Sequence, residues 1–242
     1  MTVHTEWRER VLLVTLDRRE RRNAVDHATL LALQAAQAEA AEAAARVLVL
    51  TGAPPAFSSG ADLTGVEGGT FADALAATLR GFTELPCTCV AAVDGPALGA
   101  GMQLAAACDL RVATPGSAFG IPAARLGLAV DHWTVERLTR EVGWPTARAM
   151  LLAATTATAA ELAGGFVHRL GGLDDALAWA DELALLAPLT VAAHKVALER
   201  SAPAPGIDEL VAEARARAWA SDDAEEGRTA FLEKRPARFT GR

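Results

Sequence analysis

The chain has 242 residues, of which 51% are hydrophobic, and it carries a formal net charge of −7. This length supports one sizeable core, and we expect one domain with a C-terminal extension. The acidic balance argues against a basic surface that binds nucleic acid or anionic membranes.

Cysteine usage and hydropathy bear on the location of the chain. The three cysteines are odd in number, and Cys87 and Cys89 are too close along the chain for an unstrained disulfide bond. The sequence shows neither a secretory signal nor about 20 uninterrupted apolar residues, so we expect a cytoplasmic protein without a membrane span. His and Cys residues do not cluster at ligand spacing, and we expect no metal site.

Short apolar runs alternate with helical segments in the first half of the chain. Val11–Leu16 predicts a strand, the alanine-rich segment Ala28–Ala45 a helix, and Val47–Thr51 a buried strand. The alternation continues with a helix over Phe71–Phe82, a strand over Val90–Val93, a helix over Gly101–Ala107 and a strand over Leu110–Ala113. Strands that are apolar throughout and separated by helices indicate a parallel sheet with βαβ crossovers.

The pattern changes at Thr134, after which one helix is expected to follow another. The interruptions are Pro145, Gly164-Gly165, Gly171-Gly172, Pro188 and Pro203-Ala-Pro205. The apolar faces of this tail pack either on the chain's own core or between subunits, and both interpretations stay open.

Five motifs follow one another along the chain. They are Arg18-Arg-Glu-Arg-Arg-Asn-Ala24, Val49-Leu-Thr-Gly52 through Ala56-Phe-Ser-Ser-Gly-Ala-Asp-Leu63, Ala92-Val-Asp-Gly-Pro-Ala-Leu-Gly-Ala-Gly101 continuing to Ala107-Cys-Asp-Leu-Arg111, Phe119-Gly-Ile-Pro122 with Arg125-Leu-Gly-Leu128, and Phe231-Leu-Glu-Lys-Arg-Pro236. Together they resemble the enoyl-CoA hydratase/isomerase (crotonase) family over almost the whole chain. The resemblance implies an α/β fold, with a ClpP-like crotonase spiral of ββα units over residues 1–185. It also implies a C-terminal helical trimerisation region over residues 186–242 and a homotrimer or hexamer.

Two glycine-containing turns carry the candidate chemistry. Each follows an apolar strand, and the first N–H groups of a helix lack partners within that helix. The resemblance assigns two backbone N–H donors to these turns, at Ala61 and Ala100, which grip a thioester oxygen as an oxyanion hole. Removing one such donor typically costs about 3 kcal/mol of transition-state stabilisation. An alanine at position 100 serves as a donor provided that its φ is negative.

Two residues differ from the pattern of hydratases in this family. Hydratases place glutamates at the positions that Gln103 and Ala123 occupy here, and those glutamates hold water and move protons. Glutamine cannot take a proton at neutral pH, and alanine can neither donate nor accept. We therefore expect little or no hydration of enoyl-CoA substrates.

Asp131 is the carboxylate that remains. Gly127-Leu-Ala-Val-Asp131 resembles the stretch of dienoyl-CoA isomerases in which an Asp transfers a proton. The alternative is that Asp131 caps the helix that begins near Thr134, which is typically worth about 1 kcal/mol. Both roles are compatible. The neighbouring Trp133 is a candidate wall of the acyl pocket or a core residue, and His132 is a candidate pocket base or a surface residue.

The resemblance also implies that the coenzyme A end of a ligand lies at the arginine-rich loop 18–24. Guanidinium groups match phosphate oxygens, so Arg19 and Arg22 are candidate phosphate partners. The resemblance adds Ala24, Ser59, Gly60 and Lys234 to the coenzyme A contacts, with Lys234 reaching the ligand of a neighbouring subunit. The alternative for Lys234 is an exposed cation at a helix end.

Three functional hypotheses follow, and whether the chain is an enzyme stays open. The first is a protein that binds acyl-CoA thioesters with an intact oxyanion hole but little or no hydratase activity. The second is an acyl-CoA isomerase or hydrolase that uses Asp131. The third is a genuine enoyl-CoA hydratase of fatty-acid metabolism. Coenzyme A enters as part of the ligand, and no cofactor is expected.

Overall fold

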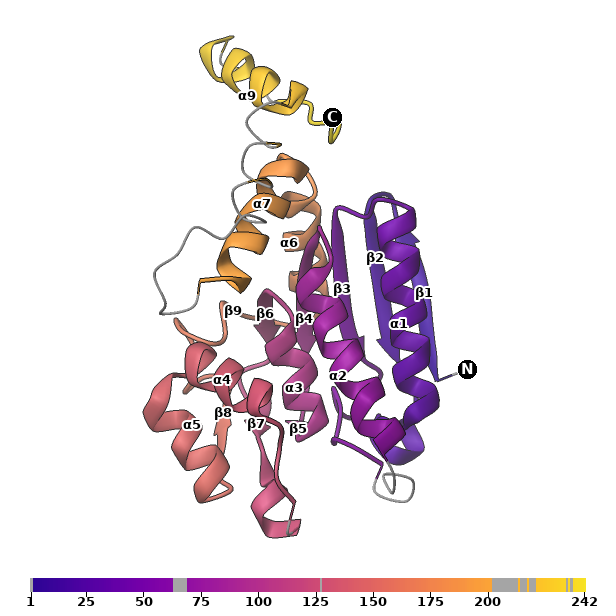
Figure 1. The fold of residues 1–242 in the computed structure, drawn as a ribbon, viewed down its shortest axis with the longest axis vertical. Coiled ribbons are helices and arrows are strands. Elements are labelled where there is room, and N and C mark those ends of the chain that lie inside the picture. Colours follow the sequence, from indigo (N-terminus) through magenta and orange to yellow (C-terminus); the bar gives the residue numbers. More distant parts are fainter. Residues whose placement is uncertain are drawn as a thin grey trace.

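A six-stranded sheet forms the centre of the computed structural model, which describes residues 2–62, 69–126, 128–201, 213, 217, 221–233, 235 and 237–242 (Figure 1). Its strands, in spatial order, are β1 (Val3–Arg8), β2 (Val11–Leu16), β3 (Val47–Gly52), β4 (Thr88–Val93), β6 (Leu110–Ala113) and β9 (Arg169–Leu170). β1 pairs with β2 in antiparallel register, and every other neighbouring pair is parallel.

Helices cover both faces of this sheet. α1 (His27–Glu42), α2 (Gly69–Glu84) and α3 (Ala100–Ala107) share one apolar cluster with alternate strand residues such as Leu48 and Leu50. α6 (Leu173–Leu183) packs on the opposite face, against Val47 and Val49. Because successive side chains of a strand point to opposite faces, covering both faces requires the uninterrupted apolar runs seen in the sequence.

A second, three-stranded sheet lies beside α3. It consists of β5 (Ala97–Leu98), β7 (Ala118–Gly120) and β8 (Thr156–Thr158), with β5 and β7 parallel and β7 and β8 antiparallel. The other helices of the described residues are the 3-10 helices η1 (Arg19–Arg21) and η2 (Pro122–Leu126), together with α4 (His132–Glu141), α5 (Gly143–Leu152), α7 (Pro188–Glu199) and α9 (Asp222–Glu233).

The predicted strands and the parallel pairing are confirmed, but two expectations on elements are corrected and one strand was not predicted. The helix expected to reach Ala45 ends at Glu42, because Ala44 has a positive φ of 51° that a helix does not contain. β1 was not predicted, since it is an edge strand with only Val3 buried. The expected succession of helices after Thr134 is wrong for residues 153–172, which hold β8, β9 and turns.

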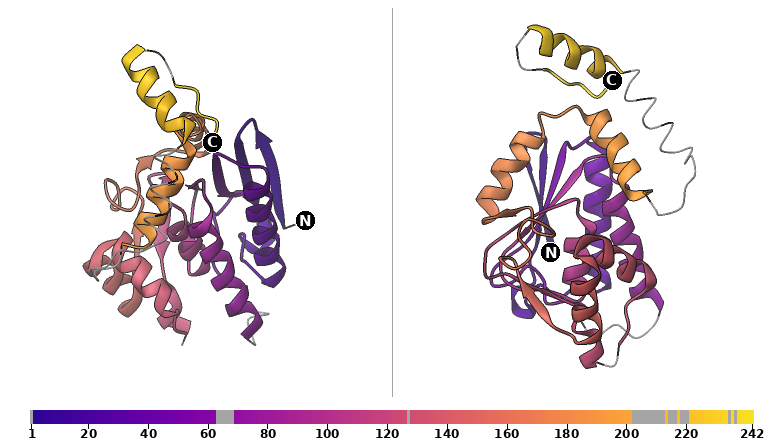
Figure 2. Two further views of the ribbon diagram at one scale, coloured as in Figure 1. Left: turned by 45° about the horizontal axis from the view of Figure 1, so that its top comes forward. Right: turned by 90° about the vertical axis from the view of Figure 1, so that its left-hand side faces the viewer.

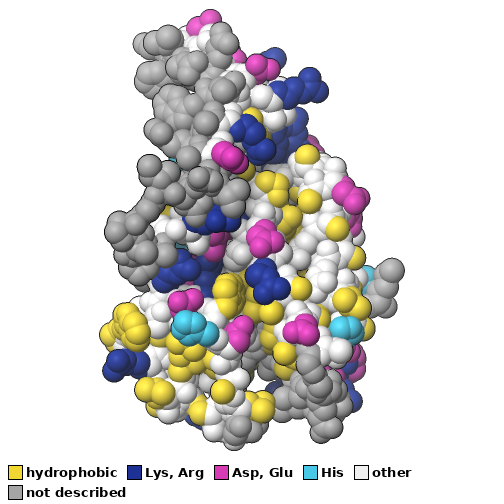
Figure 3. Space-filling view, in the orientation of Figure 1, with side chains coloured by type: hydrophobic (Ala, Val, Ile, Leu, Met, Phe, Trp, Pro, Cys, Tyr) yellow, Lys and Arg dark blue, Asp and Glu magenta, His cyan; other side chains and the backbone are white. Residues whose placement is uncertain are grey.

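The C-terminal elements lie at one end of the molecule. α9 projects beyond the sheet, and the segment after it returns to the body, where Arg46 Nη2 donates to the Phe239 carbonyl over 3.0 Å (Figure 2). Hydrophobic side chains gather elsewhere on the surface, over α4 and α5 at the lower left of Figure 3, and Trp144 and Leu152 of α5 are 63% and 79% exposed. The predicted boundary between the spiral core, residues 1–185, and the C-terminal trimerisation region, residues 186–242, falls between α6 and α7. This division stays a prediction.

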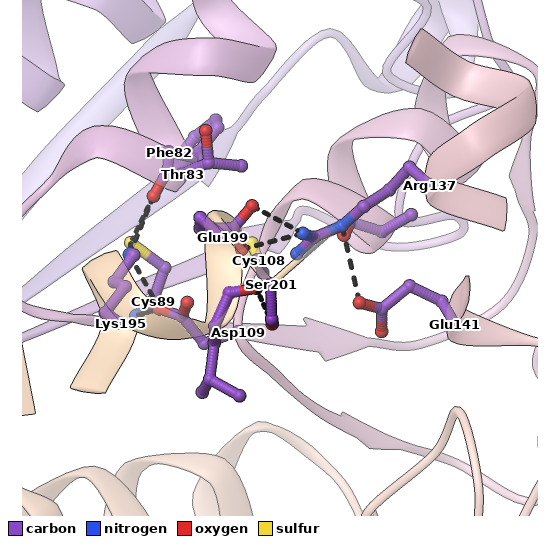
Figure 4. Close-up of polar contacts among 12 residues, drawn as sticks. Phe82, Thr83, Cys89, Cys108, Asp109, Arg137, Glu141, Lys195, Glu199 and Ser201 are labelled. Carbon is purple, nitrogen blue, oxygen red and sulfur yellow. Dashed lines mark hydrogen bonds and ion pairs between the residues drawn. The ribbon is translucent and has the colours of Figure 1, made fainter. Parts of the chain in front are cut away.

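Two ion pairs, each with a buried cation and a partly buried carboxylate, attach α7 to the rest of the chain (Figure 4). Lys195 Nζ lies 2.8 Å from Asp109 Oδ2 and also donates to the backbone carbonyls of Phe82 and Cys87. Arg137 of α4 pairs with Glu199 at 2.7 Å. Charges removed from water need such partners, so these contacts fix α7 against α4 and the end of α2.

Candidate functional site

An apolar cavity of about 510 Å³ lies where the two sheets and their helices meet. Its walls come from the turn before Asp62, the first half of α2, the start of α3, the segment entering η2, and the segment before α4. The lining residues are Ser59, Gly60, Ala61, Phe71, Ala72, Leu75, Ala76, Gly99, Ala100, Gln103, Ile121, Pro122, Ala123, Leu128, Ala129, Val130 and Asp131. Segments far apart in sequence thus enclose one pocket with few polar groups.

Two turns approach each other closely at one wall of this cavity. Gly60 and Gly99 have positive φ values of 112° and 52°, which residues with a side chain rarely adopt. A Cβ atom on Gly60 would lie 3.7 Å from the backbone nitrogen of Ala100. Ser58 joins the turns, since its backbone N–H donates to Pro96 and its carbonyl accepts from Leu98, both at 3.0 Å. The predicted pairing of the two turns is therefore present.

The backbone N–H groups of Ala61 and Ala100 are available to a ligand. Val25 bonds to the residues on either side of Ala61, through the Gly60 carbonyl and the Asp62 N–H at 2.8 Å each, so the Ala61 N–H points away from Val25. Ala100 begins α3, where an N–H has no helical acceptor. Neither group donates a hydrogen bond within the described part of the chain. Ala100 also has the required negative φ.

A hydrogen-bonded chain of three side chains reaches the cavity from α4. Gln103 Nε2 donates to Thr134 Oγ1 over 2.6 Å, and the Thr134 hydroxyl donates to Asp131 Oδ1. The Thr134 backbone N–H also donates to Asp131 Oδ1, at 3.1 Å, so Asp131 caps α4. The capping prediction is confirmed, and Asp131 lines the cavity as well. Ala123 contributes only apolar surface to the same cavity.

Comparisons with known proteins agree over nearly the whole chain. The model of the family described as Enoyl-CoA hydratase/isomerase matches residues 6–242. The probable enoyl-CoA hydratase echA6 of Mycobacterium tuberculosis is 41% identical over 235 residues, which cover 96% of this chain and 97% of that protein. The 2,3-dehydroadipyl-CoA hydratase of Escherichia coli is 35% identical over 249 residues, with 97% and 96% covered.

The chain belongs to the enoyl-CoA hydratase/isomerase family. Its fold agrees with that assignment. The solved structure of a putative enoyl-CoA hydratase from Streptomyces coelicolor superposes with a TM-score of 0.90 at 31% identity, covering 100% of this chain and 95% of that one. The predicted α/β crotonase fold is confirmed.

Trp133 and His132 occupy different surroundings from those of the cavity wall. Neither is among the residues that line the cavity. The His132 side chain is 85% exposed and lies 4.0 Å from Glu136, so the surface interpretation describes its position. Trp133 is partly buried and packs against the main core cluster, as the core interpretation expects.

The loop 18–24 lies against the Ser59–Gly60 turn. The Ser59 N–H donates to the Arg22 carbonyl at 3.0 Å, and Ser59 Oγ donates to the Arg21 carbonyl at 3.1 Å. Arg22 and Arg19 are both exposed, but Arg19 is paired with Asp17 at 2.8 Å. Ala24 is buried, and the predicted contact at Lys234 lies outside the described residues.

Arg18 has a structural role that the sequence did not indicate. Its guanidinium donates to the Ala24 carbonyl at 2.7 Å and pairs with Asp26 and Asp62 at 3.1 and 3.0 Å. It therefore holds the loop to the turn that ends at Asp62 and is less available to a phosphate than Arg22.

The structure adds residues to the site that were not predicted. Thr134 was recognised only as a helix start, and no pattern links it to Gln103, which is 31 positions away. Phe71, Leu75 and Ile121 supply much of the apolar wall. Their only signal in the sequence was hydrophobicity at helix and strand positions, which core residues share.

The described residues show no metal-binding cluster and no single membrane-spanning helix. No group of three or more His, Cys, Asp and Glu side chains among them is placed to hold a metal ion. Within these residues no single helix is long and apolar enough to cross a membrane. Only α6 and α7 taken together, with a bend of 112° between them, have the length and apolar composition of a membrane span.

Proposed function

We propose that this chain binds acyl-coenzyme A thioesters and has little or no enoyl-CoA hydratase activity. The observation that carries the proposal is the pair of unused N–H groups at Ala61 and Ala100, at the wall of an apolar cavity. Two convergent donors suit a thioester carbonyl oxygen, and apolar walls suit an acyl chain. The family membership and the names of the relatives support the same ligand class.

The expected loss of hydration follows from the groups around the cavity. Adding water to a double bond requires one group that accepts a proton from water and one that delivers a proton to carbon. Gln103 and Ala123 supply neither. Among the lining residues that the structure describes, Asp131 has the only carboxylate, and its Oδ1 already accepts two hydrogen bonds from Thr134.

Calorimetry tests the binding proposal. Titration of the purified chain with butyryl-CoA and longer saturated acyl-CoAs is expected to show saturable binding, tighter than that of free coenzyme A. The same preparation is expected to leave crotonyl-CoA unhydrated when products are measured by mass. Absence of acyl-CoA binding would overturn the proposal.

A second candidate function is an isomerase or hydrolase reaction that uses Asp131. The supporting observation is that Asp131 lines the cavity and is exposed, with no partner for Oδ2 among the described residues. Asp131→Asn is expected to abolish any such reaction and to preserve binding, because the Asn oxygen still caps α4. Equal turnover by the variant would remove this candidate.

Genuine hydration is the third candidate, and the names of the relatives favour it. Hydration of crotonyl-CoA by the wild-type chain at ordinary enzymatic rates, about 10 per second or more, would establish it and refute the first proposal.

Assembly and location complete the proposal. We expect a homotrimer or hexamer that forms through residues 186–242, and exposed leucines near the start and end of α7 support a covered surface there, at Leu185, Leu186 and Leu198. Light scattering after gel filtration tests this assembly, and a monomer would refute it.

We also propose that the chain acts in the cytoplasm. For coenzyme A, we propose phosphate contacts from Arg22 and a further contact from Lys234.

A further inference from the structure

Gln103, Thr134 and Asp131 form a hydrogen-bonded chain whose direction is fixed, and its first two members are buried. Gln103 and Thr134 are only 6% and 1% exposed, so water has little access to their contact. An ionised carboxylate only accepts hydrogen bonds, and a threonine hydroxyl has a single proton. That proton goes to Asp131, and the Thr134 oxygen is left as an acceptor for Gln103.

The orientation of the Gln103 amide follows from this proton count. The amide must present its nitrogen to Thr134, which matches the observed contact of 2.6 Å from Nε2. The amide oxygen, Oε1, is then left over. It accepts no hydrogen bond from any described residue, and it is not among the fully buried atoms that lack a partner. Since Gln103 lines the cavity, Oε1 faces the space that a ligand would fill.

A ligand must therefore satisfy or desolvate one hydrogen-bond acceptor in an otherwise apolar wall. A saturated acyl chain covers Oε1 without replacing the water it displaces, which carries a free-energy cost. A chain with a hydroxyl group supplies a donor instead. Gln103 lies three residues after Ala100 on α3, and this corresponds to a rise of about 4.5 Å along the helix. The hydroxyl group would thus lie a few bonds from the thioester carbonyl held at Ala100.

We propose that Gln103 is a specificity residue that selects acyl thioesters with a hydroxyl group close to the thioester carbonyl. Thr134 and Asp131 are positioning residues that keep the amide oxygen toward the cavity. This inference rests on the proposed function, because it requires the acyl chain to occupy the same cavity.

The test compares two ligands that differ by one hydroxyl group. Calorimetry on the full chain at neutral pH measures the Kd of butyryl-CoA and of each enantiomer of 3-hydroxybutyryl-CoA. We expect at least one enantiomer to bind about fivefold more tightly than butyryl-CoA, the ratio given by a hydrogen bond of about 1 kcal/mol. Gln103→Leu is expected to reduce this ratio to about one.

A matched pair of threonine variants separates positioning from stability. Thr134→Val removes the hydroxyl group but keeps the backbone N–H that Asp131 caps, and the selectivity ratio is expected to fall toward one. Thr29 caps α1 in the same way, with its N–H and hydroxyl 2.8 and 2.7 Å from Asp26 Oδ1, and it does not line the cavity. Thr29→Val therefore removes an equivalent capping bond and is expected to leave the ratio unchanged.

The outcomes distinguish this inference from the function on which it rests. If the wild-type chain binds butyryl-CoA and both hydroxylated ligands equally well, the specificity role is refuted and the proposed function stands. If none of the ligands binds, both are refuted. If Thr29→Val lowers the ratio as much as Thr134→Val does, the positioning role of Thr134 is refuted.

Discussion

Ala100→Pro removes one proposed oxyanion donor with little expected damage to the fold. Ala100 is the first residue of α3, and its N–H has no acceptor among the described residues. Proline is well tolerated at the first position of a helix, and α7 of this chain already begins with Pro188. A residue before a proline must avoid the helical region of backbone conformation. Gly99 meets this requirement, because its φ of 52° and ψ of −120° lie in the mirror image of the extended region, which only glycine adopts without strain.

The expected effect depends on the charge of the oxygen that Ala100 contacts. A neutral thioester carbonyl that loses one hydrogen bond is expected to lose about 0.5–1.5 kcal/mol, or a factor of about 2–12 in Kd. A ligand with an enolate oxygen is expected to lose about 3 kcal/mol, or more than a hundredfold. Calorimetry with butyryl-CoA measures the first value. The thermal midpoint of Ala100→Pro is expected to stay close to that of the wild type.

The control ligand is S-butyl-CoA, a thioether without the carbonyl oxygen. Its affinity is expected to be the same for Ala100→Pro and the wild type, and Ala100→Gly, which keeps the N–H, is expected to bind both ligands normally. A weakening of the thioether equal to that of the thioester would show that the proline ring blocks the cavity. Unchanged thioester affinity would refute the role assigned to the Ala100 N–H.

Two further predictions concern stability. Lys195→Met leaves the partly buried Asp109 carboxylate without its cation, and we expect a loss of about 3 kcal/mol in the free energy of unfolding measured by urea denaturation. Arg169→Met removes an exposed pair with Glu182 and a cation–π contact over Trp179, and it should cost only about 1 kcal/mol. Burial and the Arg111 charge lower the pKa of His168 from 6.5 to about 4, and its Nδ1 accepts the Arg111 backbone N–H at 3.2 Å. As the pH falls, the unfolded chain therefore takes up this proton at a higher pH than the folded chain does. The free energy of unfolding decreases as the pH falls from 6.5 toward 4. We expect this effect to lower the free energy of unfolding by about 1 kcal/mol, because the ring is partly exposed, and to be absent in His168→Asn. An equal slope of unfolding free energy against pH for the wild type and His168→Asn would contradict the assignment.

The sequence predicted those parts of the fold whose signal is local. The apolar runs in β2 and β3 are buried on both faces, and this is the pattern that parallel strands require. β1 was missed because an edge strand with polar residues resembles a loop. β8 and β9 have three and two residues, too few to show a periodicity. These short strands form only where the rest of the fold supplies a partner.

For the candidate site, the sequence indicated the backbone turns that a motif fixes, but it did not indicate the contacts between distant segments. Gly60 and Gly99 marked the two turns, and the resulting positions of Ala61 and Ala100 follow from them. The contact from Gln103 to Thr134 joins α3 to α4, and no local pattern indicates it. The buried role of Lys195 was also missed, because a lysine on a helix is usually solvated.

The hydration rate of crotonyl-CoA tests the central claim most directly. It is measured at saturating substrate, by mass, for the wild-type chain and for the double variant Gln103→Glu with Ala123→Glu. We predict no hydration above background for the wild type and measurable hydration for the double variant, because the double variant keeps the cavity and the proposed donors at Ala61 and Ala100. A wild-type rate of about 10 per second or more would contradict the account.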